Sequence, residues 1–161
     1  MITDPLAKKT DLLSFNTYIS WYGSDKPESL DTLKWDLPQD KPIFISEFGC
    51  GAVAGYHDHP DVRFSEDYME RYYRHTLKML EGIPGLCGTT PWILADFRSP
   101  RRLLTDVQDN FNRKGLVSEK GYKKSGFFVM KDWYEKIRRR CESPRVFTAF
   151  PDGYLDQADS I

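Results

Sequence analysis

The sequence predicts an α/β fold with parallel strands, because short apolar runs alternate with helical patterns along most of its 161 residues. Three such pairs of a strand and a helix can be marked. Long loops, rich in aromatic and polar side chains, follow the expected strands. In parallel α/β proteins the loops at the carboxyl ends of the strands build the active site. We therefore look for the function in these loops.

The first unit has a strand within residues 11–18 (DLLSFNTY), then a polar loop and a helix at about residues 28–35. The second has a strand in residues 42–47 (PIFISE) and, after a long loop, a helix that starts at Ser65. Serine is a good N-cap, and the acidic Glu66 and Asp67 suit the positive end of the helix dipole. Apolar side chains then recur at intervals of three and four until GIPG, residues 82–85, ends the helix.

The third unit has a strand around residues 88–94 (GTTPWIL), a long loop over residues 96–121 and a helix from about residue 123 to residue 140. Lys and Arg gather at the C-terminal end of this helix, where the helix dipole favours cations. Residues 143–161 contain prolines and a Pro-Asp-Gly turn signal, which predict a tail or a small hairpin.

Length and charge limit the possible functions. The chain is long enough for about one domain with a sizeable core. Its 23 basic and 24 acidic side chains nearly cancel, so neither nucleic acid nor an anionic membrane is an expected partner. The N-terminal segment lacks the apolar core of a signal peptide, and no run approaches the roughly 20 apolar residues that a spanning helix needs. The localisation is left open.

The cysteines and histidines indicate neither a disulfide framework nor a metal site. Cys50, Cys87 and Cys141 stand far apart without a CxxC pair, so we expect reduced thiols that are mostly buried. The spacing of the three histidines requires no metal, and no cofactor is expected.

One carboxylate, Glu47, ends an otherwise apolar strand and is followed closely by two glycines. A strand tip is a rigid mount for a catalytic acid, although an acid at such a position also serves as a loop cap or an ion-pair partner. Asn16 and Tyr18 follow the first strand in the same way, and Trp92 and Asp96 lie at the end of the third. We expect these side chains to share one end of the sheet.

The aromatic residues near the strand ends favour a carbohydrate ligand. The segments NTYISWY and TPWILADF each combine aromatic rings with hydrogen-bonding groups. In sugar sites, ring faces cover the apolar side of a pyranose while Asn, Asp or Tyr bind its hydroxyls. Taken singly, Trp21, Tyr22 and Trp92 would be better interpreted as core residues, and only their combination with an acid on the intervening strand favours carbohydrate.

Five short motifs carry a resemblance to a known family. SEFG, AGYH, FSEDY, WxxADF and NxKG occur in an order and approximate spacing that is similar to the end of the catalytic barrel of family 2 glycoside hydrolases. The β-glucuronidases and β-galactosidase-like members resemble this chain most, over roughly residues 4–140. The resemblance implies a partial (β/α)₈ TIM barrel, about its last three βα units, since a closed barrel takes about 250 residues. Residues 1–142 would then be the C-terminal part of the barrel domain.

The resemblance also implies roles for individual residues. Glu47 matches the nucleophile of a retaining exo-β-glycosidase, which cleaves terminal β-linked sugars through a covalent glycosyl-enzyme. Asn16 and Tyr18 match positions that line the site, with Tyr18 touching the nucleophile or the sugar. Trp92 matches the tryptophan that packs against the sugar, and Asp96 belongs to the same segment.

Asn112 and Lys114, in NRKG, match the pair that binds the sugar's carboxylate in β-glucuronidases. An ammonium and an amide suit this task, because a carboxylate entering a partly dry pocket needs replacements for its water. Arg98, Arg101 and Arg102 either add positive charge nearby or form a solvated loop. The same context also resembles relatives that act on neutral galactosides, so the expected substrate is a β-glucuronide or a β-galactoside.

One element of the family pattern is missing. A retaining glycosidase needs a second carboxyl group about 5 Å from the nucleophile, and in the family it follows an asparagine on an earlier strand. No Asn-Glu dipeptide occurs in residues 1–46, so we expect the acid/base to be absent and the chain alone to be inactive. The remainder of the barrel, or a self-associated copy, would cover the open sheet edges. A carbohydrate-binding module and an inactive remnant are the other open alternatives.

Overall fold

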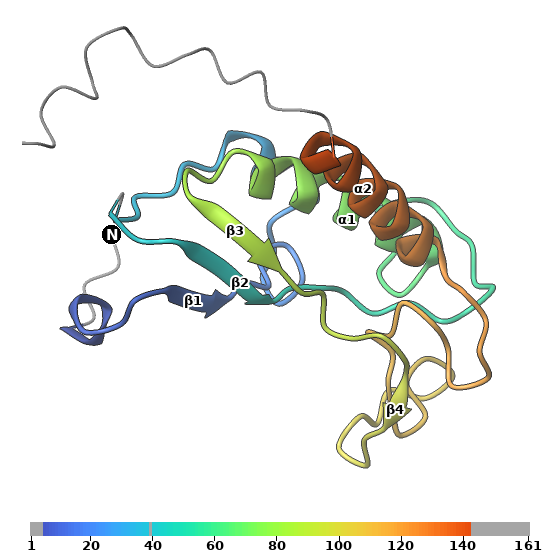
Figure 1. Ribbon diagram of the computed structural model, residues 1–161. Helices are drawn as coiled ribbons and strands as arrows, with labels where there is room; N and C mark the ends of the chain where they lie inside the picture. Colours follow the sequence, from blue (N-terminus) through green and yellow to red (C-terminus); the bar gives the residue numbers. More distant parts are fainter. Residues whose placement is uncertain (1–4, 39, 143–161) are drawn as a thin grey trace, which may run out of the picture.

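The computed structural model describes residues 5–38 and 40–142 (Figure 1). The elements follow one another in the order η1 (Pro5–Lys8), β1 (Leu13–Asn16), η2 (Pro27–Thr32), β2 (Ile43–Glu47), α1 (Glu66–Glu81), β3 (Leu86–Thr89), β4 (Phe97–Arg98), β5 (Phe111–Asn112) and α2 (Ser125–Glu142). The elements η1 and η2 are short 3₁₀ helices. The predicted tail or hairpin at residues 143–161 lies outside the described residues.

The sheet has three parallel strands in the order β1-β2-β3, which confirms the predicted α/β fold with parallel strands. Leu13 pairs with Ile43 on one side, and Ile43 pairs with Leu86 on the other. Each strand is short, and all three point toward the same end of the molecule (Figure 1). The loops that follow β1, β2 and β3 therefore meet at that end.

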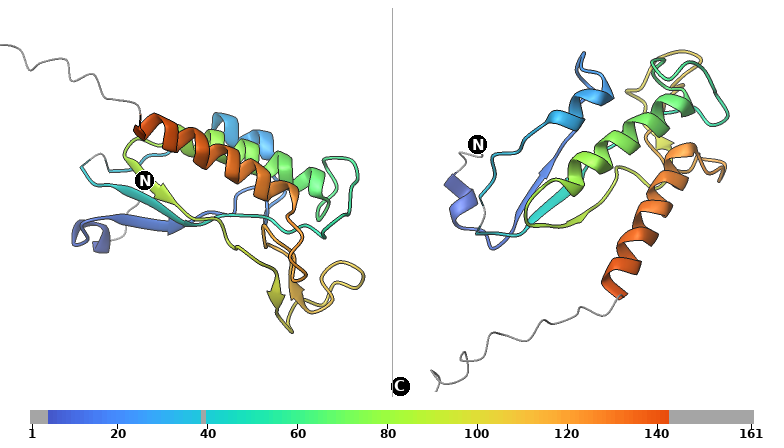
Figure 2. Two further views of the ribbon diagram at one scale, coloured as in Figure 1. Left: turned by 45° about the vertical axis from the view of Figure 1, so that its right-hand side comes forward. Right: turned by 90° about the horizontal axis from the view of Figure 1, so that it is seen from above.

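The helices α1 and α2 lie side by side over one face of the sheet (Figures 1 and 2). Gly126 brings them close together, because a Cβ atom at this residue would lie 2.9 Å from the sulfur of Met69. Alternate residues of β2 face this helical layer, so Ile43 and Ile45 are fully buried while Phe44 is only half-buried. The sheet is thus covered more completely on its helical face.

Two sequence signals place α1. Ser65 is its N-cap, and the side-chain oxygen of Ser65 accepts a 3.0 Å hydrogen bond from Tyr68 N, which confirms the predicted start. Gly82 is the C-cap, as GIPG predicted. The helix α2 begins and ends two residues later than predicted, at Ser125 and Glu142.

Three elements differ from the sequence prediction. The strand expected at residues 88–94 is found at Leu86–Thr89, because Pro91 has no N–H group to extend the hydrogen-bond ladder. The helix expected at residues 28–35 is the 3₁₀ helix Pro27–Thr32. The loop expected at residues 96–121 contains a small antiparallel hairpin of β4 and β5.

The expectation that the thiols are mostly buried is wrong. All three cysteines are free, but only Cys50 is buried, whereas Cys87 and Cys141 are exposed. Cys87 lies on β3, an edge strand with a single neighbour, and Cys141 lies in the last turn of α2. Among the described residues, no helix combines the length and the apolar character that crossing a bilayer would require.

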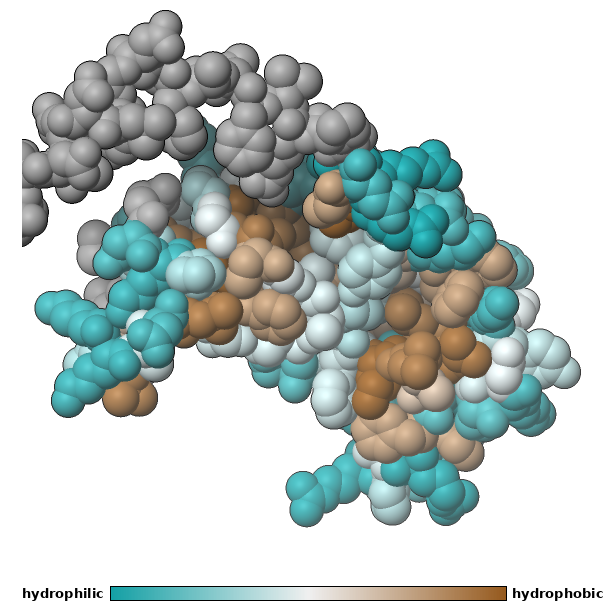
Figure 3. All heavy atoms as spheres, in the orientation of Figure 1, coloured by the Kyte–Doolittle hydropathy of each residue, from teal (hydrophilic) through white to brown (hydrophobic). Residues whose placement is uncertain are grey.

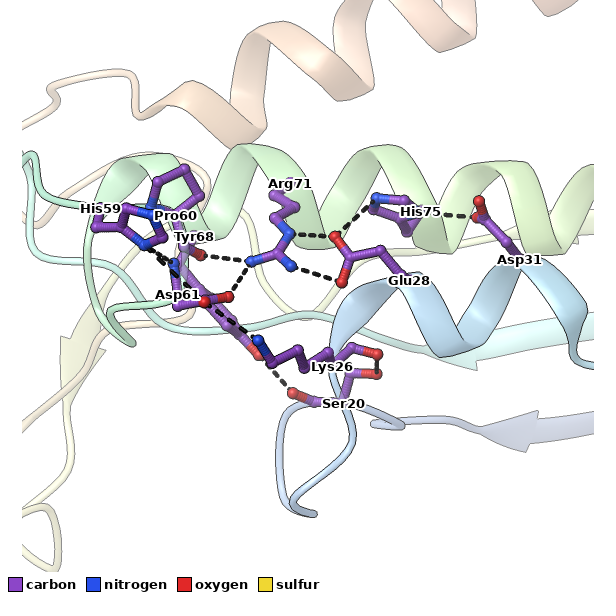
Figure 4. A network of polar contacts seen from close by, with 10 residues as sticks. All are labelled: Ser20, Lys26, Glu28, Asp31, His59, Pro60, Asp61, Tyr68, Arg71 and His75. Atoms are coloured by element: carbon purple, nitrogen blue, oxygen red, sulfur yellow. Dashed lines mark hydrogen bonds and ion pairs between the residues drawn. The ribbon is translucent and has the colours of Figure 1, made fainter.

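A network of ion pairs fastens η2 and a loop to the outer side of α1 (Figure 4). Arg71 of α1 contacts both Glu28 of η2 and Asp61 of the preceding loop. One helical turn further, His75 Nδ1 lies 2.8 Å from Asp31 Oδ1. We call this group of residues, Glu28, Asp31, Asp61, Arg71 and His75, the Arg71 network. It joins η2 to α1 and to the loop that precedes α1.

Candidate active site

Glu47 is the last residue of β2 and lies at the carboxyl end of the sheet. The hydroxyl of Tyr18 donates a hydrogen bond of 2.8 Å to Glu47 Oε2. The backbone joins the same two strand ends, since Thr17 N donates to Glu47 O at 2.8 Å. The structure therefore brings Tyr18 and Glu47 together, with the Glu47 carboxylate half-buried beside the phenol.

The phenol of Tyr18 is held in its protonated form. Burial raises its pKa well above the ordinary 10.0, and the hydrogen bond to Glu47 and the negative charge of Glu47 raise it further. At neutral pH, Tyr18 is therefore a hydrogen-bond donor to the carboxylate. A donor of this kind fixes the orientation of the carboxylate at the strand tip.

Lys114 brings a positive charge to the same place. Its side chain is buried, and its ammonium lies 5.1 Å from the ring centroid of Tyr22 and 5.8 Å from those of Tyr18 and Trp21. These distances are typical of cation–π contacts. Because Tyr18 also touches Glu47, the ammonium and the carboxylate share one aromatic neighbour.

Tyr22 responds to the charge of Lys114. Burial acts to raise its pKa, but hydrogen bonds to Lys114 and Arg102 and the charges of these two cations outweigh burial, so that the pKa is lowered. Tyr22 is 61 % exposed, whereas Trp21 is a core residue at 5 %. The rim of the candidate site is thus formed by Tyr22 and Arg102.

The loop that carries Trp92 runs between the segments that carry Glu47 and Lys114. Trp92 N donates to Phe48 O at 2.8 Å, and Ile93 N donates to Lys114 O at 3.1 Å. The Trp92 ring is half-buried and meets the Phe97 ring edge-on, with 6.3 Å between the ring centroids. Three of the residues expected at the site, Glu47, Trp92 and Lys114, therefore lie on adjacent backbone segments.

Asn112 and Asn16 occupy different environments. Asn112 lies on β5 and is buried, and its side-chain oxygen accepts a 3.2 Å hydrogen bond from Lys114 N. Asn16 ends β1, is exposed, and accepts a 2.7 Å hydrogen bond from the Ser46 hydroxyl. Asn112 thus holds the backbone at Lys114, whereas Asn16 is exposed at the carboxyl end of β1.

Asp96 is buried and held by other protein groups. Its side chain has no exposed area, and both of its carboxylate oxygens lie 2.8 Å from the ammonium of Lys124. One of these oxygens also accepts a 2.8 Å hydrogen bond from Gly115 N. Burial raises the pKa of Asp96 and lowers the pKa of Lys124, while the attraction within the pair opposes both shifts. Asp96, which we expected among the substrate-binding residues because it shares the segment of Trp92, has both carboxylate oxygens engaged by Lys124 and one of them also by Gly115.

Lys124 was missed by the sequence reasoning. It directly precedes α2, where the positive end of the helix dipole is unfavourable for a cation. A lysine at this position needs a compensating anion, which is a signal that the sequence does carry. The identity of the anion, Asp96, is a long-range contact that local patterns do not encode.

Apolar side chains gather on the visible face at two places, over the strands and near the β4 hairpin (Figure 3). At the hairpin, the exposed apolar residues include Leu94, Phe97, Leu103 and Leu104. Hollows follow both outer strands: one along β1 is lined by residues such as Leu12. The other lies along β3 and α2. Both outer strands of the sheet therefore border open apolar surface.

The chain is similar to known β-glucuronidases over most of its length. No family model matches the chain. It is 29% identical over 155 residues to the β-glucuronidase of Homo sapiens, covering 88% of this chain and 23% of that protein. It is 30% identical over 123 residues to the β-glucuronidase of Streptococcus agalactiae, covering 71% of this chain and 20% of that protein. The chain thus spans less than a quarter of the length of these relatives.

Solved structures give the same answer. A family 2 β-galacturonidase from Eisenbergiella tayi, bound to galacturonate, matches with a TM-score of 0.69 and 29% identity over 83% of this chain and 25% of that chain. A Faecalibacterium prausnitzii β-glucuronidase matches with a TM-score of 0.69 and 27% identity, over 82% of this chain and 23% of that chain.

These relatives define the class of the protein: the chain is related to the glycoside hydrolases. Within this class, its curated relatives are β-glucuronidases and its structural neighbours include family 2 enzymes, so that it is similar to a portion of a family 2 catalytic domain, which confirms the resemblance found in the sequence motifs.

Proposed function

We propose that this chain supplies the nucleophile and the carboxylate-binding group of a retaining exo-β-glycosidase that removes terminal uronic acids. The proposal rests on the joint position of Glu47 and Lys114, since Glu47, at the end of β2, and Lys114, in the loop after β5, both contact Tyr18. The relatives, β-glucuronidases and a β-galacturonidase, are enzymes of uronic acids, which supports this substrate class.

In this mechanism, Glu47 attacks the anomeric carbon and forms a covalent glycosyl-enzyme, which water then hydrolyses. Tyr18 donates to one carboxylate oxygen of Glu47, which supports attack by the other. Lys114 would meet the carboxylate of the sugar, and the buried Asn112 would assist it by holding the backbone before Lys114. Trp92 would pack against the sugar ring.

The acid/base carboxyl group would come from outside this chain. The three parallel strands would form about the last three βα units of a (β/α)₈ barrel, with further strands on both sides. The apolar hollows along β1 and along β3 support this proposal, because soluble proteins normally cover such surfaces. The remainder of the barrel would supply the covering strands and the second carboxyl group.

The test is to complete the barrel by joining this chain to the preceding part of a related barrel, fused or in trans. Incubation with a 2-fluoro-glycosyl fluoride of glucuronic acid should add the mass of one sugar to the peptide that contains Glu47. The completed enzyme should hydrolyse an aryl β-glucuronide, and Glu47→Gln should remove both activity and labelling. Binding of the sugar without labelling would instead indicate a carbohydrate-binding module, and neither would indicate an inactive remnant.

The substrate is tested by Lys114→Met, with Lys120→Met as the matched control because Lys120 is an exposed lysine of the same loop. Removing one partner of a desolvated charge pair costs about 2–5 kcal/mol, or roughly thirty-fold to several thousand-fold in kcat/KM. The loss should fall on the β-glucuronide and spare the β-galactoside. Equal losses on both substrates, or a wild-type preference for the galactoside, would favour the β-galactosidase alternative.

A further inference from the structure

We propose that Lys124 is a positioning residue, whose buried ammonium fixes the segment on both sides of Lys114 so that Lys114 reaches the substrate site. This inference rests on the proposed function of Lys114. Lys124 itself is fully buried, at 0 % exposure, and contacts neither Glu47 nor any open surface. It would therefore act only through the residues that it holds.

Four oxygen atoms surround the ammonium of Lys124. Besides the two oxygens of Asp96, it lies 2.7 Å from Ala52 O and 3.1 Å from Arg113 O. These acceptors come from three segments: the loop after β2, the loop after β3 and the residue before Lys114. An ammonium has three donors and no acceptor, so one lysine joins all three segments.

The residue after Lys114 is held by the same pair. Gly115 N donates to Asp96 Oδ1 at 2.8 Å. The approach is too close for a side chain, because a Cβ atom at Gly115 would lie 2.2 Å from Asp96 N and 2.4 Å from Val117 O. Both neighbours of Lys114 are therefore held by the pair: the carbonyl oxygen of Arg113 by Lys124, and the amide of Gly115 by Asp96.

A second set of contacts links this segment to the loop of Glu47. Ala52 N donates to Arg113 O at 2.9 Å, while Ala52 O accepts from Lys124. Ala52 follows Glu47 by five residues, so the distance between Glu47 and Lys114 depends on this junction. Replacing a whole buried ion pair by apolar residues is often neutral or stabilising. The Asp96–Lys124 pair would therefore serve the geometry of this junction more than the stability of the fold.

The experiment compares Lys124→Met with Lys120→Met in the completed enzyme. Lys124→Met should lower the ratio of kcat/KM for the β-glucuronide to kcat/KM for the matching β-glucoside by about 10- to 100-fold, since a misplacement of about 1 Å has an effect of this size. Lys120→Met should leave the ratio unchanged. Equal losses on both substrates would overturn the proposal, because a general loss of structure lowers both together.

Hydrogen exchange on the chain itself gives a readout that does not depend on activity. In Lys124→Met, the Gly115 amide should lose about tenfold more protection, or more, than amides in the middle of α1, such as that of Leu77, which report the general loss of stability. If Gly115 and Leu77 lose protection to the same extent, Lys124 only stabilises the whole fold and the positioning role is rejected. An unchanged Gly115 rate rejects it as well.

The two proposals fail in different ways. If the completed wild-type enzyme shows no preference for the glucuronide, the proposed function fails, whatever the Gly115 amide does. If the wild type prefers the glucuronide and Lys124→Met changes neither the ratio nor the exchange rate, only the positioning role fails. Asp96→Asn gives a second variant, which should lower the ratio in the same direction because the amide cannot neutralise Lys124.

Discussion

Two groups of ion pairs in this chain differ in one respect, their exposure to water. The Asp96–Lys124 pair has 0% side-chain exposure on both sides. In the Arg71 network, the Arg71 side chain is 21% exposed and that of Glu28 47% exposed. Both groups join segments that are distant in the sequence, one at the carboxyl ends of the strands and the other on the outer side of α1.

The difference in exposure sets the consequences of losing one partner. A buried charge that loses its partner has no water to replace it, whereas an exposed one is rehydrated. Substitutions in the Arg71 network should therefore change the stability of the fold little. Removing only one member of the Asp96–Lys124 pair should be strongly destabilising.

The largest effect is expected for Asp96→Ala. It leaves the Lys124 ammonium buried without its anion, which costs about 3–5 kcal/mol of stability. Urea denaturation followed by circular dichroism measures this loss. Asp132→Ala, at an exposed position of α2, is the control and should stay within about 0.5 kcal/mol of the wild type. A loss at Asp96 no larger than at Asp132 would remove the contrast between the two groups.

A smaller effect is expected for Arg71→Met, which removes the contacts with Glu28 and Asp61 but keeps most of the aliphatic stem. The Arg71–Glu28 pair is partly exposed, so its loss costs about 1 kcal/mol or less. The loss should shrink when the urea titration is repeated in 1 M salt, because salt screens exposed charges. A cost that equals that of Asp96→Ala, or that is indifferent to salt, contradicts this expectation.

The contribution of Arg71 should also depend on pH. Hydrogen bonds from Arg71 lower the pKa of Glu28 below its ordinary 4.5 and that of Asp61 below 3.8. Carboxylates with lowered pKa values stabilise the folded state above their unfolded pKa, and this stabilisation is lost as the pH falls through the folded pKa. The difference in stability between wild type and Arg71→Met should thus be constant near neutral pH and decrease below about pH 4.5. If the stability difference between wild type and Arg71→Met grows on acidification, Arg71 does not lower the pKa values of Glu28 and Asp61.

The smallest effect is expected for Arg74→Met. Arg74 pairs with Glu70 one turn earlier on α1, and its side chain is 64% exposed. Pairs of this kind contribute about 0.3–0.5 kcal/mol. Thermal unfolding should therefore place Arg74→Met between the wild type and Arg71→Met, and a larger shift than that of Arg71→Met would break the order.

The parts that sequence predicted well are those governed by neighbours along the chain. The start of α1 follows from Ser65 and the acids after it, and the tip position of Glu47 follows from an apolar run that ends at a carboxylate. The end of β3 was predicted too late, because the apolar run continues past Pro91. The prolyl residue is itself the signal that this prediction overlooked.

The parts that sequence did not predict depend on contacts across the chain. The strands β4 and β5 have two residues each, too short for a period-two pattern, and the segment between them is turned by positive φ at Asp106, Asp109 and Asn110. Asp96 has the residue type of a sugar-binding group, and only the position of Lys124 reveals where its charge goes. Residue types near strand ends were predictable, whereas their partners were not.

The hydrogen bond from Lys124 to Ala52 spans 72 positions of the sequence, which bears on the order in which the molecule forms. Contacts between distant residues close large loops and form late in folding. During synthesis, Glu47 and Asp96 leave the ribosome before Lys124 does, so the junction at the carboxyl ends of the strands cannot form until Lys124, the residue before α2, has emerged. The site of the nascent chain is thus completed late, as α2 begins to emerge.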